Sequence, residues 1–293
     1  MEWMEKGQTV LIVGLGLMGG SYARALTRLG YRVTAIDRDP EAIAYALAEG
    51  FIRDGSASEE TEEKLVREAD ALVFALYPGI FPEWVEKHRD QFKSGTKMTD
   101  VTGVKSCVVY RIQEMLRPDV EFIAAHPMAG REVYGVENST AELFRGANYI
   151  VIPTEKNTPE AVALCRELGE VLGFARISEL DPEKHDDMIA FLSQLTHCIA
   201  VALMTSNTEP HLVDYTGDSF RDLTRIARIN EDMWSELFLL NKKKLVAQID
   251  AFTGELHRMR TYLADENVDK MKEMMRISTA RRALFDKPKP KES

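Results

Sequence analysis

The chain has 293 residues, of which 45% are hydrophobic, and this is enough for two domains with a sizeable core. Its formal net charge of -10 argues against a nucleic acid or an anionic membrane as a general partner. We find no secretory leader and no apolar run of membrane-spanning length, and the three cysteines lie far apart in the chain. We therefore expect a cytoplasmic protein. The spacing of histidines and cysteines predicts no metal site.

The first predicted element is a strand that runs into a glycine-rich turn. Thr9–Val13 is apolar and β-branched, which is typical of a buried strand, and a G-x-G-x-x-G sequence follows it directly. A helix predicted from Met18 to Leu29 would direct its free N–H groups toward a bound phosphate. We therefore predict that a dinucleotide binds to this turn, through Gly14, Leu15, Gly16, Leu17, Met18 and Gly19.

A second predicted strand, 31–36, ends at Asp37. A carboxylate at this point can accept hydrogen bonds from the ribose hydroxyls and would repel a 2′-phosphate, so the sequence favours NAD over NADP. Arg38 weakens that preference, because an arginine can accommodate the extra phosphate. Tyr77 and Pro78 end a third predicted strand and are expected to form a wall of the same cofactor cleft.

Strands and helices alternate through the first half of the chain. Further strands are predicted at 71–76, 97–100, 122–125 and 174–177, and helices at 40–49, 59–67, 81–92, 104–116 and 160–172. This alternation predicts an α/β fold with a doubly wound, mostly parallel sheet. In such a sheet the chemistry lies beyond the carboxyl ends of the strands.

His126 directly follows the predicted strand 122–125 and is the leading candidate for a catalytic base. Histidine suits the removal of a hydroxyl proton, because its unperturbed pKa lies near neutral pH. A histidine at this kind of position is often only a loop residue, but the turn at Gly130 with Arg131 and Glu132 favours a functional role.

From Asp181 onward the pattern is helical, and we place a domain boundary between residues 178 and 179. The prediction is a dinucleotide-binding domain at 1–178, a helical domain at 179–285 and a flexible tail at 286–293. The helix predicted at 182–205 is apolar around most of its circumference and is expected to be buried. Ser193 and His197 share one of its faces, either as part of a cleft or with His197 as a hydrogen-bonded core residue.

Three arginines (Arg221, Arg225 and Arg228) have helical spacing, which would align them as a solvated stripe or as a clamp for a carboxylate. Asn230 is a predicted cap for a helix that contains Trp234. The amphipathic pattern from Leu237 to Leu263 suggests a helical dimer interface.

Between Val10 and Phe285 the chain resembles the prephenate and arogenate dehydrogenases of tyrosine biosynthesis. The resemblance rests on the glycine turn continued to Gly20-Ser21, His126-Pro127-Met128-Ala129-Gly130 with Glu132, Ser193 with His197, and Asp222-Leu223-Thr224-Arg225-Ile226-Ala227 leading to Trp234. It implies a Rossmann-type domain followed by an all-helical dimerisation domain, and a homodimer. We also expect no appended regulatory domain, so any inhibition by tyrosine would have to act at the active site.

The resemblance implies a role for each matched residue. His126 would be the catalytic histidine bonded to the ring hydroxyl, and Arg225 would bind a substrate carboxylate. Ser193, His197, Glu132 and Trp234 would line or border the substrate pocket. Many members have a serine where this chain has Gly103, so either Thr102 supplies the missing contact or nothing does. Gln194 and Thr196 also depart from the family pattern, so the resemblance does not decide which side chain of the substrate is preferred.

The activity implied is oxidative decarboxylation of prephenate, a small anionic substrate, to 4-hydroxyphenylpyruvate, CO2 and NADH, with NAD as cofactor. Arogenate as the substrate is the nearer alternative. A non-catalytic NAD-sensing protein is the remoter one, and a hydroxyacid or imine reductase on the same fold is a weaker third.

Overall fold

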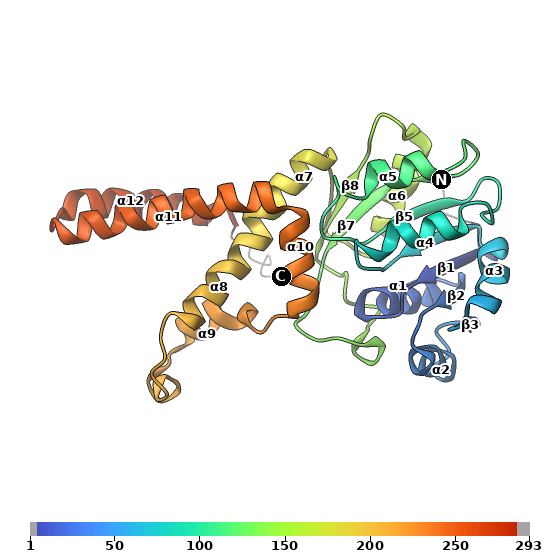
Figure 1. The fold of residues 1–293 in the computed structure, drawn as a ribbon, viewed down its shortest axis with the longest axis horizontal. Helices are drawn as coiled ribbons and strands as arrows, with labels where there is room; N and C mark the ends of the chain where they lie inside the picture. Colours follow the sequence, from blue (N-terminus) through green and yellow to red (C-terminus); the bar gives the residue numbers. More distant parts are fainter. Residues whose placement is uncertain (1–4, 286–293) are drawn as a thin grey trace, which may run out of the picture. The chain divides into compact units, whose positions relative to one another are not determined.

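A six-stranded parallel sheet forms the centre of the first part of the computed structural model, which describes residues 5–285 (Figure 1). The strand order is β3-β2-β1-β4-β5-β6, so the order reverses between β1 and β4. The strands are β1 (Thr9–Val13), β2 (Arg32–Ile36), β3 (Asp54–Ser56), β4 (Ala71–Phe74), β5 (Lys97–Asp100) and β6 (Glu121–Phe122). Strand β3 was missed by the sequence analysis, because its three residues, Asp54, Gly55 and Ser56, carry no apolar pattern.

Helices connect and cover these strands. They are α1 (Leu17–Arg28), α2 (Pro40–Ala48), α3 (Glu59–Glu68), α4 (Ile80–His88), α5 (Val109–Met115) and α6 (Pro159–Val171). All were expected, although α5 is shorter than the range 104–116 predicted for it. Strand β4 likewise stops at Phe74 instead of residue 76. The two residues after it, Ala75 and Leu76, line a cavity instead.

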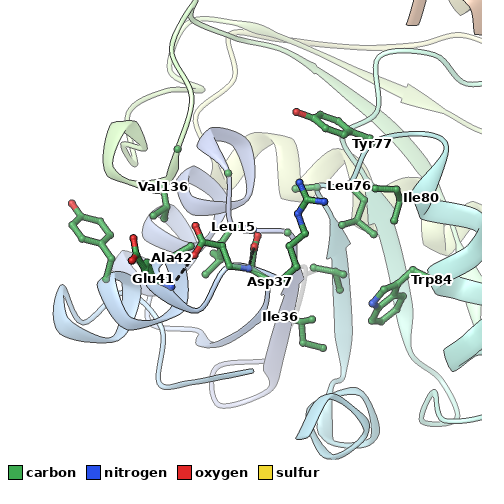
Figure 2. Close-up of a pocket in the computed structure, with 18 of the residues that line it drawn as sticks. Leu15, Ile36, Asp37, Glu41, Ala42, Leu76, Tyr77, Ile80, Trp84 and Val136 are labelled. Atoms are coloured by element: carbon green, nitrogen blue, oxygen red, sulfur yellow. Dashed lines mark hydrogen bonds between the residues drawn. The ribbon is translucent and has the colours of Figure 1, made fainter. Parts of the chain in front are cut away.

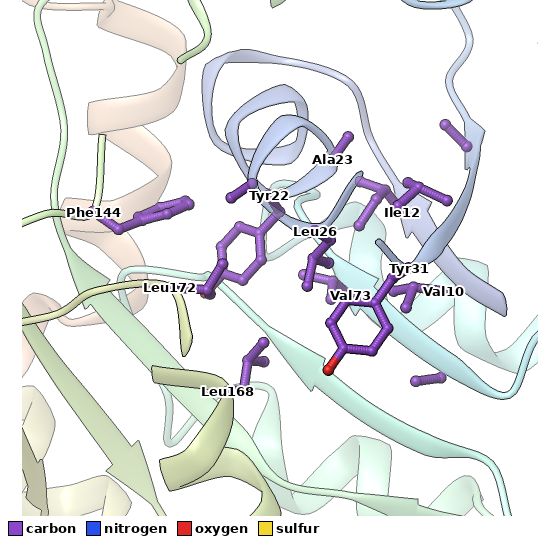
Figure 3. Packing of buried hydrophobic residues seen from close by; sticks show 14 of the residues in the cluster. Val10, Ile12, Tyr22, Ala23, Leu26, Tyr31, Val73, Phe144, Leu168 and Leu172 are labelled. Atoms are coloured by element: carbon purple, nitrogen blue, oxygen red, sulfur yellow. The ribbon is translucent and has the colours of Figure 1, made fainter. Parts of the chain in front are cut away.

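The core has two halves because successive strand residues point to opposite faces of the sheet. Val10 and Ile12 belong to one buried cluster, while Leu11 and Val13 belong to the other. Figure 3 shows the first cluster, in which Tyr22 and other side chains of α1 pack over the sheet. Burial on both faces explains why these strands are continuously apolar in the sequence.

A second, three-stranded sheet follows the first, with β7 (Ala124–Met128), β8 (Asn148–Ile152) and β9 (Arg176–Glu179) in the order β7-β8-β9. Strands β7 and β8 are antiparallel, and His126 pairs with Ile150. Two expectations were therefore wrong. The predicted strand 122–125 is divided at Ile123 between β6 and β7, and His126 lies within a strand rather than after one. Strand β8 was not predicted at all.

The chain from Pro182 to Leu240 is mostly helical, with loops between its elements, which are α7 (Pro182–Ile189), a π-helical turn (Ala190–Leu195), α8 (Thr196–Thr205), a 3₁₀ turn (Leu212–Tyr215), α9 (Asp218–Thr224) and α10 (Glu231–Leu240). The caps predicted for this part of the chain are present: Asp181 accepts from Lys184 N at 2.7 Å, and Asn230 accepts from Met233 N at 2.9 Å. A π-helical turn inside an α-helix often marks a functional site. Here it carries Ser193.

The helix 182–205 is less buried than expected, since Phe191 is 53% exposed and Leu192 is 50% exposed. By length and composition alone, Pro182–Thr205 could cross a bilayer, with a mean hydropathy of 1.7, so the expectation that no run reaches membrane-spanning length was wrong. A single helix of this kind is weak support for a membrane span, because helices in the core of soluble proteins meet the same criterion.

The chain divides into two compact units, one ending at Lys242 and one beginning at Lys243. In the second unit a short turn at residues 265–267 joins α11 (Lys242–Ala264) to α12 (Val268–Arg282), as Figure 1 shows. The boundary proposed between residues 178 and 179 stays a prediction. The predicted tail 286–293 lies outside the described residues.

Candidate active site

A cleft of about 790 Å³ lies at the carboxyl ends of β1, β2 and β4, where the order of the strands reverses (Figure 2). Open parallel sheets bind their ligands at such a point. Of the residues predicted to bind the cofactor, this cleft is lined by Gly14, Leu15, Gly16, Asp37, Arg38 and Tyr77. An adjoining cavity of about 380 Å³ is lined by the others, Leu17, Met18, Gly19 and Pro78, and shares Gly16 and Tyr77.

The glycine turn fits a bound pyrophosphate. A Cβ on Gly19 would lie 1.8 Å from the carbonyl oxygen of Gly14, so this contact between helix and strand requires glycine. A Cβ on Gly16 would meet no atom within 4 Å, because this position faces open space at the junction of the two cavities. Gly16 therefore leaves the room that a phosphate group needs to approach the backbone.

Asp37 is held at the end of β2 by two backbone donors. Its Oδ2 accepts from Leu15 N at 2.5 Å and its Oδ1 accepts from Asp39 N at 2.8 Å. A carboxylate has about four acceptor positions, so two remain for ribose hydroxyls. Figure 2 shows Asp37 in the cleft, with Leu15 on one side and Leu76 and Tyr77 on the other. The sequence analysis did not identify Trp84 and Ile80, which also line this cleft.

The smaller cavity brings together residues from distant parts of the chain. It is lined by His126 from β7, Ser193 from the π-helical turn and Trp234 from α10. Helix α10 is also tied to the loop after β4, because Glu236 Oε1 accepts from Gly79 N at 2.5 Å. The candidate base therefore lies in a cavity that adjoins the cofactor cleft.

His126 is the first member of a hydrogen-bonded chain that the sequence analysis missed. Its Nδ1 lies 2.9 Å from Nε2 of His185, and Nδ1 of His185 lies 2.8 Å from Oδ1 of Asp186. The backbone N–H groups of Lys105 and Ser106 donate to the two oxygens of Asp186 at 2.8 and 2.9 Å. In the described part of the chain, Nε2 of His126 has no hydrogen-bond partner.

A buried ion pair supports the same strand ends. Nζ of Lys105 donates to Asp100 Oδ2 at 2.7 Å and to the carbonyl oxygen of Ala125 at 2.6 Å, and both charged side chains are fully buried. Asp100 in turn accepts from Ala125 N at 3.2 Å. The ion pair therefore forms hydrogen bonds with both backbone groups of Ala125, the residue that precedes His126.

Thr102 lines the cavity, but its hydroxyl is already engaged. It donates to Asp100 and lies 3.1 Å from the carbonyl oxygen of Val104, and it accepts from Lys105 Nζ at 3.2 Å. This geometry argues against the expectation that Thr102 replaces the missing serine. A Cβ on Gly103 would lie 3.5 Å from Leu237, an ordinary contact, so the backbone leaves room for a side chain at that position.

The remaining predicted substrate residues, Arg225, Glu132 and His197, do not line this cavity, but they form two contacts beside residues that do. Arg225 Nη1 forms an ion pair with Glu132 Oε1. The ring of His197 stacks on Trp234 with centroids 3.7 Å apart, and its Nδ1 donates to the carbonyl oxygen of Ser193 at 2.9 Å. His197 is therefore hydrogen-bonded, as expected if it is a core residue. It also stacks on Trp234, which lines the cavity.

The three arginines do not form a single stripe. Helix α9 ends at Thr224, and Arg225 opens a 3₁₀ turn, Arg225–Ala227. Arg221 instead pairs with Asp218 at 2.9 Å on an exposed surface. Only Arg225 of these three contacts a residue predicted for the substrate pocket.

Burial decides the charge of the histidines. It lowers the pKa of His126 well below 6.5, and the nearby His185 and Lys105 lower it further. Burial also lowers the pKa of His185, although the hydrogen bond with Asp186 opposes this. For Asp186, burial acts to raise the pKa, but the hydrogen bonds from His185, Ser106 and Lys105 outweigh it and lower the pKa. At neutral pH the chain is therefore neutral His126, neutral His185 and ionised Asp186.

Comparison with known proteins identifies the family. Residues 22–178 match the family model for the prephenate dehydrogenase nucleotide-binding domain, and residues 181–277 match that for the prephenate dehydrogenase dimerization domain. Prephenate dehydrogenase of Bacillus subtilis is 31% identical over 90% of this chain and 72% of its own length. Cyclohexadienyl dehydrogenase of Zymomonas mobilis is 29% identical over 94% of this chain and 95% of its own length.

A solved structure agrees with this assignment. The crystal structure of prephenate dehydrogenase from Aquifex aeolicus, in complex with hydroxyphenyl propionate and NAD⁺, has a TM-score of 0.88 and 31% identity and covers 95% of this chain and 98% of that one. The glycine turn with Asp37, the neighbouring cavity around His126 and these matches agree: the chain belongs to the prephenate dehydrogenase family.

Proposed function

We propose that the protein catalyses the NAD-dependent oxidative decarboxylation of prephenate to 4-hydroxyphenylpyruvate. The observation that carries the proposal is the position of His126, a neutral base that lines a cavity adjoining the dinucleotide cleft and whose Nε2 has no hydrogen-bond partner among the described residues. NAD supplies the acceptor for the hydride that leaves the hydroxyl-bearing ring carbon. The glycine turn would hold its pyrophosphate and Asp37 its adenosine ribose.

His126 would take the proton of the ring hydroxyl through Nε2. General-base assistance of this kind is worth about 10²–10⁴-fold in rate. The low pKa of His126 keeps the ring neutral, and therefore able to accept a proton, at neutral pH. Ser193 and Trp234 would border the substrate ring, since both line the cavity.

Arg225 would bind a substrate carboxylate at the cavity edge, because a guanidinium matches a carboxylate with two parallel hydrogen bonds. In the structure Arg225 pairs with Glu132. When an anionic substrate binds, Arg225 would either leave Glu132 or bind both carboxylates. Arg225 would thus position the substrate without taking part in proton transfer.

Arogenate is the second candidate substrate. It carries an ammonium group where prephenate carries a keto oxygen, and the carboxylate of Glu132 at the cavity edge is a suitable partner for that ammonium. The similarity to a cyclohexadienyl dehydrogenase also supports this alternative.

The working form would be a homodimer. Support comes from the match to a dimerization-domain model and from the exposed apolar residues Phe191 and Leu192 on the helix 182–205. A second copy of the chain would cover such residues. Light scattering coupled to gel filtration tests this, and a monomer at micromolar concentration would contradict it.

The test of the function is NADH formation by the purified protein with prephenate and with arogenate, each offered with NAD and with NADP. The proposal expects rapid turnover of prephenate with NAD. Preferential turnover of arogenate would select the second candidate. If neither substrate reacts while NAD still binds, the proposed activity is wrong even though the cofactor assignment stands.

A further inference from the structure

We propose that His185 and Asp186 are positioning residues for catalysis, because they hold His126 in the tautomer that carries its proton on Nδ1 and leaves Nε2 free to act as the base. This inference deepens the proposed function and rests on it for its kinetic part. It depends on three side chains that are hydrogen-bonded in series from the cavity inward, from His126 through His185 to Asp186.

The order of donors and acceptors in this series starts at Asp186. An ionised carboxylate only accepts hydrogen bonds, so His185 must donate through Nδ1 over the 2.8 Å contact. A neutral imidazole has one donor and one acceptor nitrogen, so Nε2 of His185 then bears no proton. It must accept from Nδ1 of His126 over the 2.9 Å contact. His126 consequently has its lone pair on Nε2.

Asp186 is itself held by backbone groups. This keeps it an acceptor, so the hydrogen bonds run from His126 through His185 to Asp186. Lys105 N and Ser106 N donate to its two oxygens, and the carbonyl oxygen of Asp186 accepts from Nδ2 of Asn241 at 2.9 Å. His185 is fully buried and Asp186 is 2% exposed, so water does not compete for these contacts. The other charged groups nearby, Asp100 and Lys105, neutralise each other at 2.7 Å.

The same geometry assists the proton transfer. When Nε2 of His126 takes the hydroxyl proton, the imidazole becomes positively charged, and its Nδ1–H already points at His185. The positive charge is then stabilised through His185 by the carboxylate of Asp186. No other proton acceptor or co-reactant is required, since one O–H bond breaks and one N–H bond forms.

The first part of the test reads the tautomer without using activity. Histidine labelled with ¹⁵N in the full-length protein reports which ring nitrogen carries the proton, and His126→Asn assigns the resonance of His126 by its loss. We expect Nδ1–H with a bare Nε2 at neutral pH in the wild-type protein, and the loss of this preference in His185→Leu. Nε2–H in the wild-type protein would overturn the proposal.

The second part compares kinetics for His185→Leu, His185→Gln and a control, His88→Gln, which replaces another buried histidine outside this series. We expect His185→Leu to lower kcat by about 10–100-fold, the range found when partners that orient metal-bound imidazoles are removed. NAD affinity should not change. His185→Gln should recover part of the loss, because its amide oxygen can accept from His126.

The pH profile separates positioning from a merely structural role. Nε2 of His185 is hydrogen-bonded to Nδ1 of His126 and links it to Asp186, so the acid limb of kcat/KM should shift in His185→Leu and stay in place in His88→Gln. Equal kcat and equal profiles for His185→Leu and His88→Gln would overturn the proposal. If the wild-type protein oxidises neither prephenate nor arogenate, the proposed function fails, while the tautomer measurement still decides this inference.

Discussion

The phosphate-binding part of the cofactor cleft is predicted to be one contiguous glycine turn, whereas the cavity around His126 is assembled from side chains that lie far apart in the sequence. Gly14, Leu15 and Gly16 line the cofactor cleft, and the rest of the turn, up to Gly19, lines the adjoining cavity. In the second, the hydrogen bond from His126 to His185 spans 59 residues and the one from Lys105 to Asp186 spans 81. A site built from local backbone depends on the absence of side chains, and a site built from distant side chains depends on every partner being present.

The largest effect expected from this comparison is at Gly19. In Gly19→Ala, the new Cβ would overlap the carbonyl oxygen of Gly14 at 1.8 Å, and neither backbone can move freely. We expect a loss of about 4 kcal/mol or more in the free energy of unfolding, measured by urea denaturation. Gly16→Ala is the matched control, because its Cβ meets no atom: it should fold normally and lose only NAD affinity. Equal stability of the two variants would show that the turn is less tightly packed than described.

The next largest loss of stability is expected for Lys105→Met, because it leaves the buried Asp100 carboxylate without a counter-charge. The expected loss in the free energy of unfolding is about 3–5 kcal/mol. Lys97→Met is the control, since the Lys97–Glu121 pair is partly exposed and should be worth less than about 1 kcal/mol. Similar losses for the two variants would contradict the role given to the buried pair.

Arg225→Ala should mainly raise KM for prephenate, by about 10-fold or more, because a hydrogen bond to a charged group contributes about 1.5–3 kcal/mol. Arg221→Ala, from the same predicted stripe, should leave KM unchanged, since Arg221 pairs with Asp218 on the surface. Steady-state kinetics of both variants check this. An unchanged KM for Arg225→Ala would show that Arg225 is a solvated surface residue and does not bind the substrate.

Acid should destabilise the protein through His126 and His185. The pKa values of His126 and His185 are lowered in the folded state, so the folded chain binds fewer protons than the unfolded one below pH 6.5. Their contribution is complete above about pH 6.5 and is lost as pH falls from there toward their folded pKa values. Urea unfolding at several pH values measures this, and His126→Asn should show a shallower dependence. A stability that does not change between pH 7 and about pH 5 would contradict it.

The smallest effect is expected for Gly103→Ser. The Cβ would make only an ordinary contact with Leu237, so the variant should fold normally. Its hydroxyl would face the cavity, and we expect kcat/KM to change by less than about 10-fold, as suits one added neutral hydrogen bond. A large loss of stability would show that the backbone cannot take a side chain there.

The contrast between local patterns and distant side chains also explains which parts of the fold and the site could be predicted from the sequence. The glycine turn, Asp37 and the parallel strands β1, β2, β4 and β5 are local patterns, and the structure contains them close to the predicted positions. His185 and Asp186 were missed because they look like ordinary polar residues in the first turns of a capped helix. Strand β8 was missed although Asn148–Ile152 is apolar, because its antiparallel pairing with β7 is not local. His126 lines the cavity, but the premise that it follows a strand was wrong, and its role as the base stays a prediction.

The central claim is that His126 is the base of an NAD-dependent oxidation, and the kcat of His126→Asn with saturating prephenate and NAD tests it most directly. The account predicts a fall of about 10²–10⁴-fold, because the variant lacks the Nε2 lone pair while the dinucleotide cleft is untouched. NAD binding measured on the same preparation should match the wild-type protein. A kcat near the wild-type value would remove His126 from the mechanism and contradict the account.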